Sequence, residues 1–310
     1  MSQPAIDMDL WKQINTVRQK GAYAATRLQV TDPLKFILGA RVNWYDHDQQ
    51  SGAGRGYAVD HELTPYAGLV YALNDSHSVY ASWTEIFEPQ STYDRDGRLL
   101  DPITGTNYEA GLKGEYFGGR LNASLAAFVV RQQNRAVDDL SGPNPCPGSA
   151  WGYCKRAAGE VESKGIELEV GGALTPDWQI MAGYTYVKTR YTKDTDAANV
   201  GQPFNGTLPR HQFKLSTTYR LPGDLRRWRV GGSVYVQSRM HVDDGSSLIA
   251  QEGYAVAGLN AAYAINPNTE LRLNVNNLFD KRYYQTIGWT TGGNVFGAPR
   301  NVLATLQHRF

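Results

Sequence analysis

The feature that most constrains this chain is a hydrophobic period of two residues that persists over long segments. Between residues 121 and 129, Leu, Ala, Leu, Ala and Val occupy every second position, with Asn122 and Ser124 between them. The same alternation returns in residues 166–170, 212–220, 271–276 and 301–310. A period of two is that of a β-strand with one apolar and one polar face. The sequence therefore predicts an all-β protein.

Thirteen segments show this pattern, and the connections between them alternate in length. The predicted strands cover residues 21–31, 34–47, 57–73, 77–88, 106–117, 120–132, 160–173, 178–191, 209–220, 227–241, 252–265, 269–284 and 298–310. The short connections carry the Gly, Pro, Asn and Asp residues of tight turns. Long connections fall between them, at residues 48–56, 89–105, 133–159, 192–208, 242–251 and 285–297. This rhythm is typical of a transmembrane antiparallel up-and-down β-barrel, which has short turns at one end and long loops at the other.

The main alternative is a large soluble β-sandwich or propeller. Most predicted strands are longer than the usual length of about 5–6 residues, and no repeat of about 40–45 residues is visible. Aromatic residues beside the short turns or at the C-terminus suit a girdle at the membrane interface: Phe117, Trp178, Tyr219, Trp228, Tyr263 and Phe310. The net charge of +1 gives no electrostatic reason to expect a nucleic-acid partner.

The N-terminal segment and the cysteines bear on processing and compartment. Residues 1–20 are predicted to form a leading loop or arm, and their opening, MSQPAIDMDL, has neither the basic nor the apolar region of a signal peptide. Cys146 and Cys154 lie in a Gly/Pro-rich segment without nearby metal ligands. A local disulfide is favoured over a zinc site, which indicates an oxidising compartment.

No catalytic motif stands out, so the chain is not predicted to be an enzyme. GxSxG, HExxH and Walker sequences are absent, and His61-Glu62 lacks a second His and is followed by Pro65. Asp94-Arg95-Asp96-Gly97 resembles part of a calcium loop without its full spacing. A rim formed by residues 45–48 and 60–61 could hold a metal, but a solvated polar rim is favoured. No resident cofactor and no metal site are predicted.

Five segments resemble TonB-dependent outer-membrane receptors, in the order that this family carries them. They are residues 101–134 (DPITGTNYEAGLKGEYFGGRLNASLAAFVVRQQN), 163–170 (SKGIELEV), 183–186 (GYTY), 274–284 (NVNNLFDKRYY) and 297–310 (GAPRNVLATLQHRF). Residues 19–46 resemble the ferric-siderophore branch of that family, of hydroxamate or pyoverdine type. The resemblance extends over nearly the whole chain.

The resemblance implies a plugged barrel of about 22 strands, of which this chain would supply the last thirteen. It also implies an outer-membrane location and TonB-dependent uptake of a ferric siderophore. Because the signal peptide, TonB box, plug and about nine strands are not seen, we expect a C-terminal fragment that does not transport by itself. TonB would act through the missing plug. A passive diffusion channel and a non-functional truncated receptor remain as alternatives.

The resemblance further suggests roles for individual residues. Aromatic and arginine side chains of the long loops would contact the siderophore: Trp289, Tyr284, Trp151, Tyr153, Tyr93, Phe204 and Arg156, together with Phe296, Arg95 and Arg190. Charged residues expected to face the lumen are Arg131, Glu109, Lys113, Glu167 and Glu169. Phe310 would anchor the last strand at the lipid interface and be read by the barrel-assembly machinery.

Overall fold

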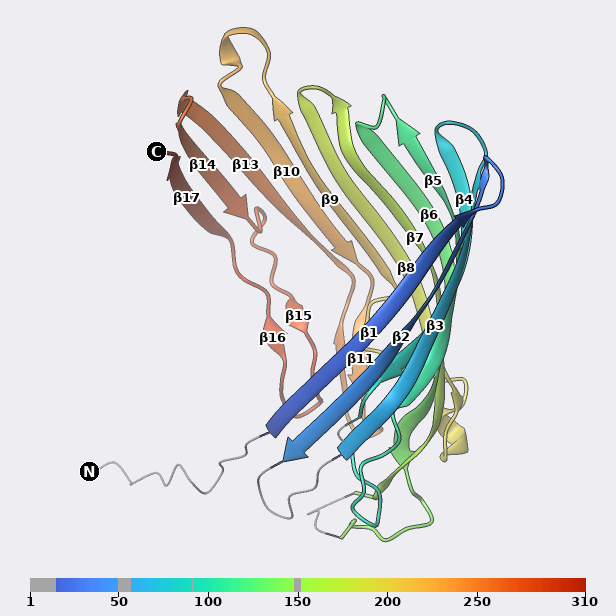
Figure 1. Ribbon diagram of the computed structural model, residues 1–310. Coiled ribbons are helices and arrows are strands. Elements are labelled where there is room, and N and C mark those ends of the chain that lie inside the picture. The colour runs from blue at the N-terminus through green and yellow to red at the C-terminus, as the bar shows by residue number, and fades with distance from the viewer. Residues whose placement is uncertain (1–14, 50–56, 91, 148–151) are drawn as a thin grey trace, which may run out of the picture.

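A single thirteen-stranded antiparallel sheet forms the body of the computed structural model, which describes residues 15–49, 57–90, 92–147 and 152–310. Its strands pair with their neighbours in chain order (Figure 1). They are β1 (Asn15–Gln29), β2 (Leu34–Gln49), β3 (Tyr57–Ala72), β4 (His77–Glu88), β5 (Ile103–Tyr116), β6 (Leu121–Asp138), β7 (Lys155–Thr175), β8 (Trp178–Lys193), β9 (His211–Arg220), β10 (Trp228–Gln237), β13 (Tyr254–Asn266), β14 (Thr269–Asn276) and β17 (Asn301–His308). The predicted all-β meander of thirteen strands is confirmed.

The two ends of the sheet differ as the sequence predicts. Short turns lie at the top of Figure 1 and long connections at the bottom. The turn between β5 and β6 shows why its sequence is Gly-rich, because Gly118 and Gly119 have φ values of 66° and 84°. Glycine adopts this left-handed region without the steric cost of a Cβ atom. Among the described residues, no helix is long and apolar enough to cross a membrane.

The two faces of the sheet have opposite character because the strands pair in a constant register. Leu112, Leu125 and Leu168 stand opposite one another across β5, β6 and β7, and all three are exposed. One residue along, Lys113, Ser124 and Glu169 form the next row, which points to the other face. That second face is concave and carries a hollow of about 860 Å³ lined in part by these three residues. An uncovered apolar convex face and a polar concave face are those of a membrane-barrel wall.

Aromatic pairs mark the short-turn end of the convex face. Trp178 packs edge-on against Tyr219, with ring centroids 6.2 Å apart, and Trp228 lies 4.7 Å from Tyr263. The described chain ends with Phe310 at this same end, fully exposed and in edge contact with His308. The position fits the predicted aromatic girdle.

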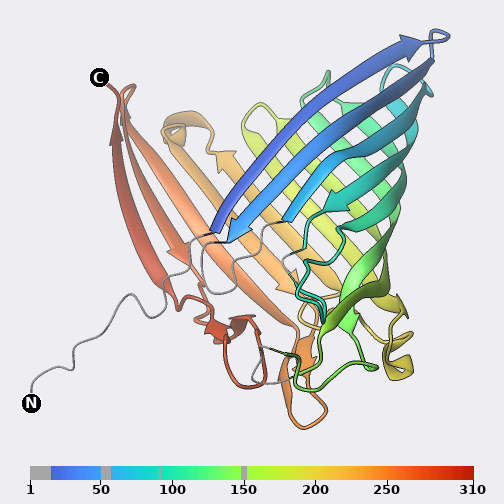
Figure 2. The same ribbon diagram turned by 60° about the horizontal axis from the view of Figure 1, so that its bottom comes forward.

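The sheet is open, and β1 and β17 are its two edges. Each pairs with one neighbour among the described residues, β1 with β2 and β17 with β14 (Figure 2). Since neighbouring strands alternate in direction and the sheet has thirteen of them, β1 and β17 run in the same direction. The described chain is therefore one curved section of wall and not a closed barrel.

Several predicted boundaries need correction. The predicted arm of residues 1–20 is too long, because β1 begins at Asn15, which pairs with Gln49; residues 1–14 lie outside the described part. The predicted strand 269–284 ends early, at Asn276. The side chain of Asn277 (φ 48°) bonds the backbone of Lys281 and Ala298 and turns the chain out of the sheet. The long connections contain two small hairpins that the sequence did not predict, β11–β12 (Met240–Asp243, Leu248–Gln251) and β15–β16 (Tyr284–Thr286, Val295–Phe296).

Candidate ligand-binding face

The first group of predicted ligand residues lies together on the β15–β16 hairpin at the long-loop end. Tyr284 and Phe296 are cross-strand partners, and their rings stack with centroids 4.4 Å apart and planes 21° apart. Trp289 lies near the tip of this hairpin and is 73% exposed. The hairpin thus presents aromatic surface to solvent, which suits an incoming ligand with flat or apolar groups.

Two hydrogen bonds fix this hairpin to the neighbouring β11–β12 hairpin. The Thr290 hydroxyl donates to the carboxylate of Asp244, and the backbone N–H of Tyr284 donates to Oε1 of Gln251 at 2.9 Å. Asp244 also accepts from the hydroxyl and backbone N–H of Ser246. These bonds, with that of Thr290 first, hold the pKa of the Asp244 carboxyl well below its usual value. The aromatic hairpin therefore has a defined position at neutral pH.

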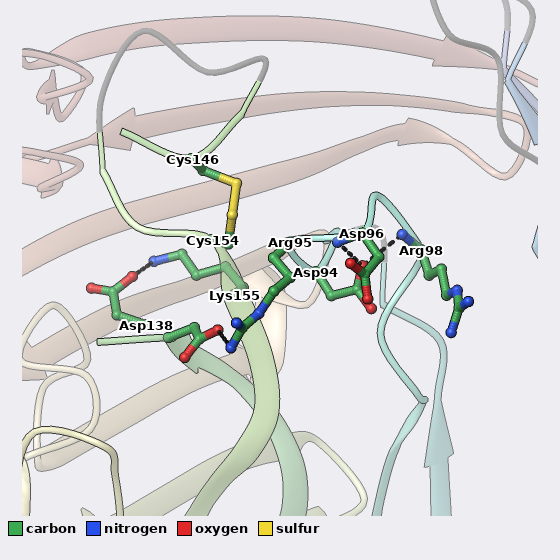
Figure 3. Close-up of a disulfide and its surroundings, with 9 residues drawn as sticks. Asp94, Arg95, Asp96, Arg98, Asp138, Cys146, Cys154 and Lys155 are labelled. Carbon is green, nitrogen blue, oxygen red and sulfur yellow. Dashed lines mark hydrogen bonds and ion pairs between the residues drawn. A yellow bond between two sulfur atoms is a disulfide. The ribbon is translucent and has the colours of Figure 1, made fainter. Parts of the chain in front are cut away.

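A second group surrounds the disulfide between Cys146 and Cys154 (Figure 3). Arg95 lies on a turn in which the Asp94 carboxylate accepts hydrogen bonds from the backbone N–H groups of Asp96 and Arg98. The Arg95 guanidinium forms an ion pair with Asp139 at 2.5 Å. Asp139 also accepts from the Ser141 hydroxyl at 2.6 Å, and its backbone N–H donates to the carbonyl of Cys154. The loop after β4 and the disulfide loop are thus joined.

The electrostatics of this second group favour a charged Asp139. The bond from Ser141, followed by the Arg95 guanidinium, lowers the pKa of the Asp139 carboxyl. Beside it lies a hollow of about 220 Å³ whose lining combines three cations and three carboxylates: Arg95, Lys155, Arg156, Asp94, Asp96 and Asp139. Arg156 is exposed and pairs with Val137 in the β6–β7 register. Within the described ranges, no group of three His, Cys, Asp or Glu residues is placed to hold a metal ion.

Gln90 connects the loop after β4 to the strands behind it. Its side chain is almost fully buried, with 8% of the residue exposed. Its amide donates to the carbonyls of Asp101 and Asn134, and its carbonyl accepts from the backbone N–H of Ala136. One side chain therefore joins the loop after β4 to two backbone segments, the approach to β5 and the end of β6.

Other predicted ligand residues are placed differently. Phe204 is half-buried, with its ring 5.4 Å from Tyr191 and under the Arg135 guanidinium at 4.3 Å, so it packs the wall. Tyr93 forms a bridge with Leu99, and Tyr153, next to the disulfide, is half-buried. Trp151 lies outside the described residues.

The predicted lumen residues divide between the two faces. Glu109, Lys113, Glu167 and Glu169 lie on the concave face; the Tyr80 hydroxyl donates to Glu109 at 2.5 Å, and the Lys113 ammonium lies 4.8 Å from the Tyr80 ring. The prediction for Arg131 is wrong. It continues the Leu125–Ala127–Val129 row on the convex face, where it pairs with Glu162 at 3.4 Å. Arg190, predicted to contact ligand, pairs with the same carboxylate there at 2.8 Å.

One concave-face cluster was missed by the sequence analysis. The rings of Tyr235 and Tyr254 lie 6.0 Å apart, and that of Tyr283 lies 4.4 Å from Tyr254. Gln237 accepts from the Tyr235 hydroxyl, while its buried amide nitrogen has no partner among the described residues. The alternation around Ser233, Tyr235 and Gln237 carried the signal, since it assigns these residues to the polar face.

A family model and curated relatives both match most of this chain. A family model described as TonB dependent receptor-like, β-barrel, matches residues 3–278. The ferric-pyoverdine receptor PbuA of a Pseudomonas species is 40% identical over 306 residues, which cover 95% of this chain and 36% of PbuA. The ferripyoverdine receptor of Pseudomonas aeruginosa is 38% identical over 94% of this chain and 36% of its own length.

Solved structures agree with this relationship. The outer-membrane receptor FpvA of Pseudomonas aeruginosa, bound to pyoverdine, has a TM-score of 0.82 and 37% identity over 96% of this chain and 42% of FpvA. The alcaligin receptor FauA of Bordetella pertussis has a TM-score of 0.71 and 40% identity over 86% of this chain. The chain spans little more than a third of the length of the curated relatives it matches. With the family model matching most of its length, the chain belongs to the TonB-dependent receptor β-barrel family.

Proposed function

We propose that this chain forms part of the barrel wall and ligand-recognition loops of an outer-membrane receptor for a ferric siderophore. The observation that carries the proposal is the 38–40% identity to ferric-pyoverdine receptors over nearly the whole chain. The ligand class we propose is therefore a pyoverdine-type ferric siderophore. Uptake would be powered through TonB acting on a plug that the described residues do not include.

The open sheet limits how many further strands such a receptor needs to close its barrel. Because β1 and β17 run in the same direction, an all-antiparallel barrel closes only with an odd number of further strands. A second copy of this chain in the same membrane orientation would bring β17 beside β1 in parallel, so it does not fit. Nine added strands satisfy the requirement and give the ~22 strands of a plugged transporter barrel.

The long-loop end supplies suitable recognition chemistry. The Tyr284–Phe296 stack and exposed Trp289 offer rigid aromatic area, which loses little conformational entropy on binding. Arg95 and Arg156 border the second hollow and can donate hydrogen bonds to carbonyl or hydroxamate oxygens. We assign the first contact with the ferric siderophore to these two groups.

A chimera tests the proposal. Residues 15–310 replace the matching segment of the Pseudomonas aeruginosa ferripyoverdine receptor in cells lacking that receptor, and uptake of radiolabelled ferric pyoverdine is measured with and without TonB. We expect TonB-dependent uptake, and about five- to tenfold weaker binding for Trp289→Ala but not for the neighbouring control Val295→Ala. A folded chimera that conducts ions in planar bilayers and binds no ferric pyoverdine would contradict the proposal and favour a passive channel.

A further inference from the structure

The sheet loses one strand pairing beside the β15–β16 hairpin. β14 pairs with β13 only from Leu259 to Asn266, so residues 254–258 of β13 have no β14 partner in the register. The chain leaves the sheet there and forms the hairpin, which lies below β14 and β17 in Figure 1. Among the described residues, one backbone hydrogen bond crosses this gap, from the N–H of Leu278 to the carbonyl of Ala257 at 2.8 Å. Contacts other than a strand ladder must therefore hold the hairpin against β13.

Most bonds of the hairpin do not reach the thirteen-stranded sheet. The Asn277 side chain bonds the backbone of Lys281 at 2.9 Å and of Ala298 at 3.0 Å, which joins the two legs of the hairpin to each other. The bonds of Tyr284 and Thr290 described above run to the β11–β12 hairpin, which is a separate two-stranded sheet. These bonds fix the shape of the loops but not their position relative to the wall.

Tyr283 supplies a contact with the wall itself. It lies directly before β15, and its ring lies 4.4 Å from that of Tyr254, with the two planes 32° apart. Tyr254 is the first residue of β13, is 6% exposed, and lies 6.0 Å from the ring of Tyr235 on β10. The second leg meets the same ring, because a Cβ atom at Gly297 would lie 2.0 Å from Cζ of Tyr283. The Tyr283 ring thus joins both legs of the hairpin to buried aromatic surface of the sheet.

We propose that Tyr254 and Tyr283 are positioning residues, whose ring contact sets where the hairpin presents Trp289 and the Tyr284–Phe296 stack to a ligand. The inference rests on the proposed function, because it takes this hairpin as a part that meets ferric pyoverdine. A hairpin released from the wall samples other positions, so only a fraction of the molecules is ready to bind. The apparent affinity falls by that fraction. The loss lies in the association rate, since the contacts made by the bound ligand are unchanged.

The position of the hairpin is measured without ligand. Spin labels are placed at the exposed residues 192, at the end of β8, and 291, near the hairpin tip, of the 310-residue chain in detergent micelles. We expect Tyr254→Leu and Tyr283→Leu to broaden the distribution of distances between the labels. Tyr283→Phe keeps the ring and should leave the distribution unchanged.

Gly297 allows a sharper test of the same contact. Gly297→Ala should shift the distance distribution, because the added Cβ displaces the Tyr283 ring. In the Tyr283→Leu background the same change should have no further effect, because the ring that it displaces is gone. Tyr66→Leu is the matched control: the Tyr66 ring of β3 covers Gly39 of β2 in the same way, with a Cβ there 2.3 Å from Cζ. It should leave the hairpin in place.

Binding is measured with the chimera described above and radiolabelled ferric pyoverdine. We expect Tyr254→Leu to lower the association rate about tenfold, a factor that corresponds to ~1.4 kcal/mol, and to change the dissociation rate less than twofold. Trp289→Ala, which removes a ligand contact, should instead raise the dissociation rate. Tyr254→Phe and Tyr66→Leu should bind as wild type does.

Three results would overturn the proposal. They are wild-type distances in Tyr254→Leu and Tyr283→Leu, an equal shift by Gly297→Ala with and without the Tyr283 ring, and a raised dissociation rate with an unchanged association rate in Tyr254→Leu. If Tyr254→Leu does not fold, Tyr283→Leu and Gly297→Ala decide, because both positions lie outside the thirteen-stranded sheet. A wild-type chimera that binds no ferric pyoverdine would refute the proposed function, and the distances would still decide the positioning role.

Discussion

Replacement of Gln90 by alanine should release the loop that carries Arg95. The side chain makes three hydrogen bonds to backbone groups of Asp101, Asn134 and Ala136, and the residue is 92% buried. Removing it leaves those three backbone groups without their partner. Each buried hydrogen bond contributes ~1 kcal/mol net, and an unsatisfied partner costs about 1–3 kcal/mol. Partial hydration of the three groups leads us to expect a loss of about 2–3 kcal/mol in the local opening free energy.

Hydrogen exchange read by mass spectrometry measures this loss directly. Amides in residues 92–103 and 133–139 should exchange about 30- to 150-fold faster in Q90A, since each 1.4 kcal/mol corresponds to a factor of ten. Gln179→Ala is the matched control, because Gln179 is exposed on β8 and its side chain makes none of these contacts. Its exchange should match wild type. Exchange in Q90A within threefold of wild type would refute the assignment of Gln90 as the fixing residue.

Three further perturbations test other parts of the structure. Removing the disulfide by C146S/C154S should destabilise the loop by about 2.5 kcal/mol, from the entropy of closing a short loop, and make residues 139–147 accessible to protease. Because its pKa is lowered in the folded protein, Asp139 stabilises the fold fully at pH values above the ordinary aspartate pKa, and this contribution is lost as the pH falls through the lowered pKa. Spin-label distances between residues 98 and 144 should therefore stay constant from pH 7 to 5 and broaden only below about pH 4. In Gly165→Val, the added Cβ would lie 2.1 Å from the carbonyl oxygen of Tyr186, so the band of folded protein in unheated gels should disappear. A yield of folded protein equal to that of wild type would show that β7 and β8 do not lie this close together at Gly165.

The strand count could be predicted because its signals are local. Alternation depends on neighbouring residues, and turn chemistry lies within a few positions of each strand end. The alternation fails where the register slips. β6 continues to Asp138, and β7 begins at Lys155. Bulges between Gln132 and Ala136 and the positive φ of Asn134 interrupt the apolar–polar alternation in this part of the sheet. The predicted strands therefore stopped at residue 132 and resumed at residue 160.

The side-chain roles were harder to predict because they depend on contacts between distant segments. Phe204 resembles an exposed loop aromatic in the sequence, yet Arg135 and Tyr191, from β6 and β8, enclose it. Arg131 shows a different error. Arg131 lies two residues after Val129, which assigns it to the apolar face of the strand, whereas its charge suggested the lumen. In the structure it lies on the apolar face. Along these strands, a residue's position in the register predicts which face of the sheet it lies on better than its chemical type does.

The most direct measurement of whether this sheet is a membrane wall is an accessibility scan along β7. Single spin labels at residues 166–171 of the membrane-inserted chain are tested for collision with oxygen, which concentrates in lipid, and with a water-soluble nickel chelate. We predict oxygen contact at Ile166, Leu168 and Val170, and nickel contact at Glu167, Glu169 and Gly171, with a period of two residues. Uniform nickel contact at all six positions would contradict a lipid-facing wall and, with it, the receptor barrel.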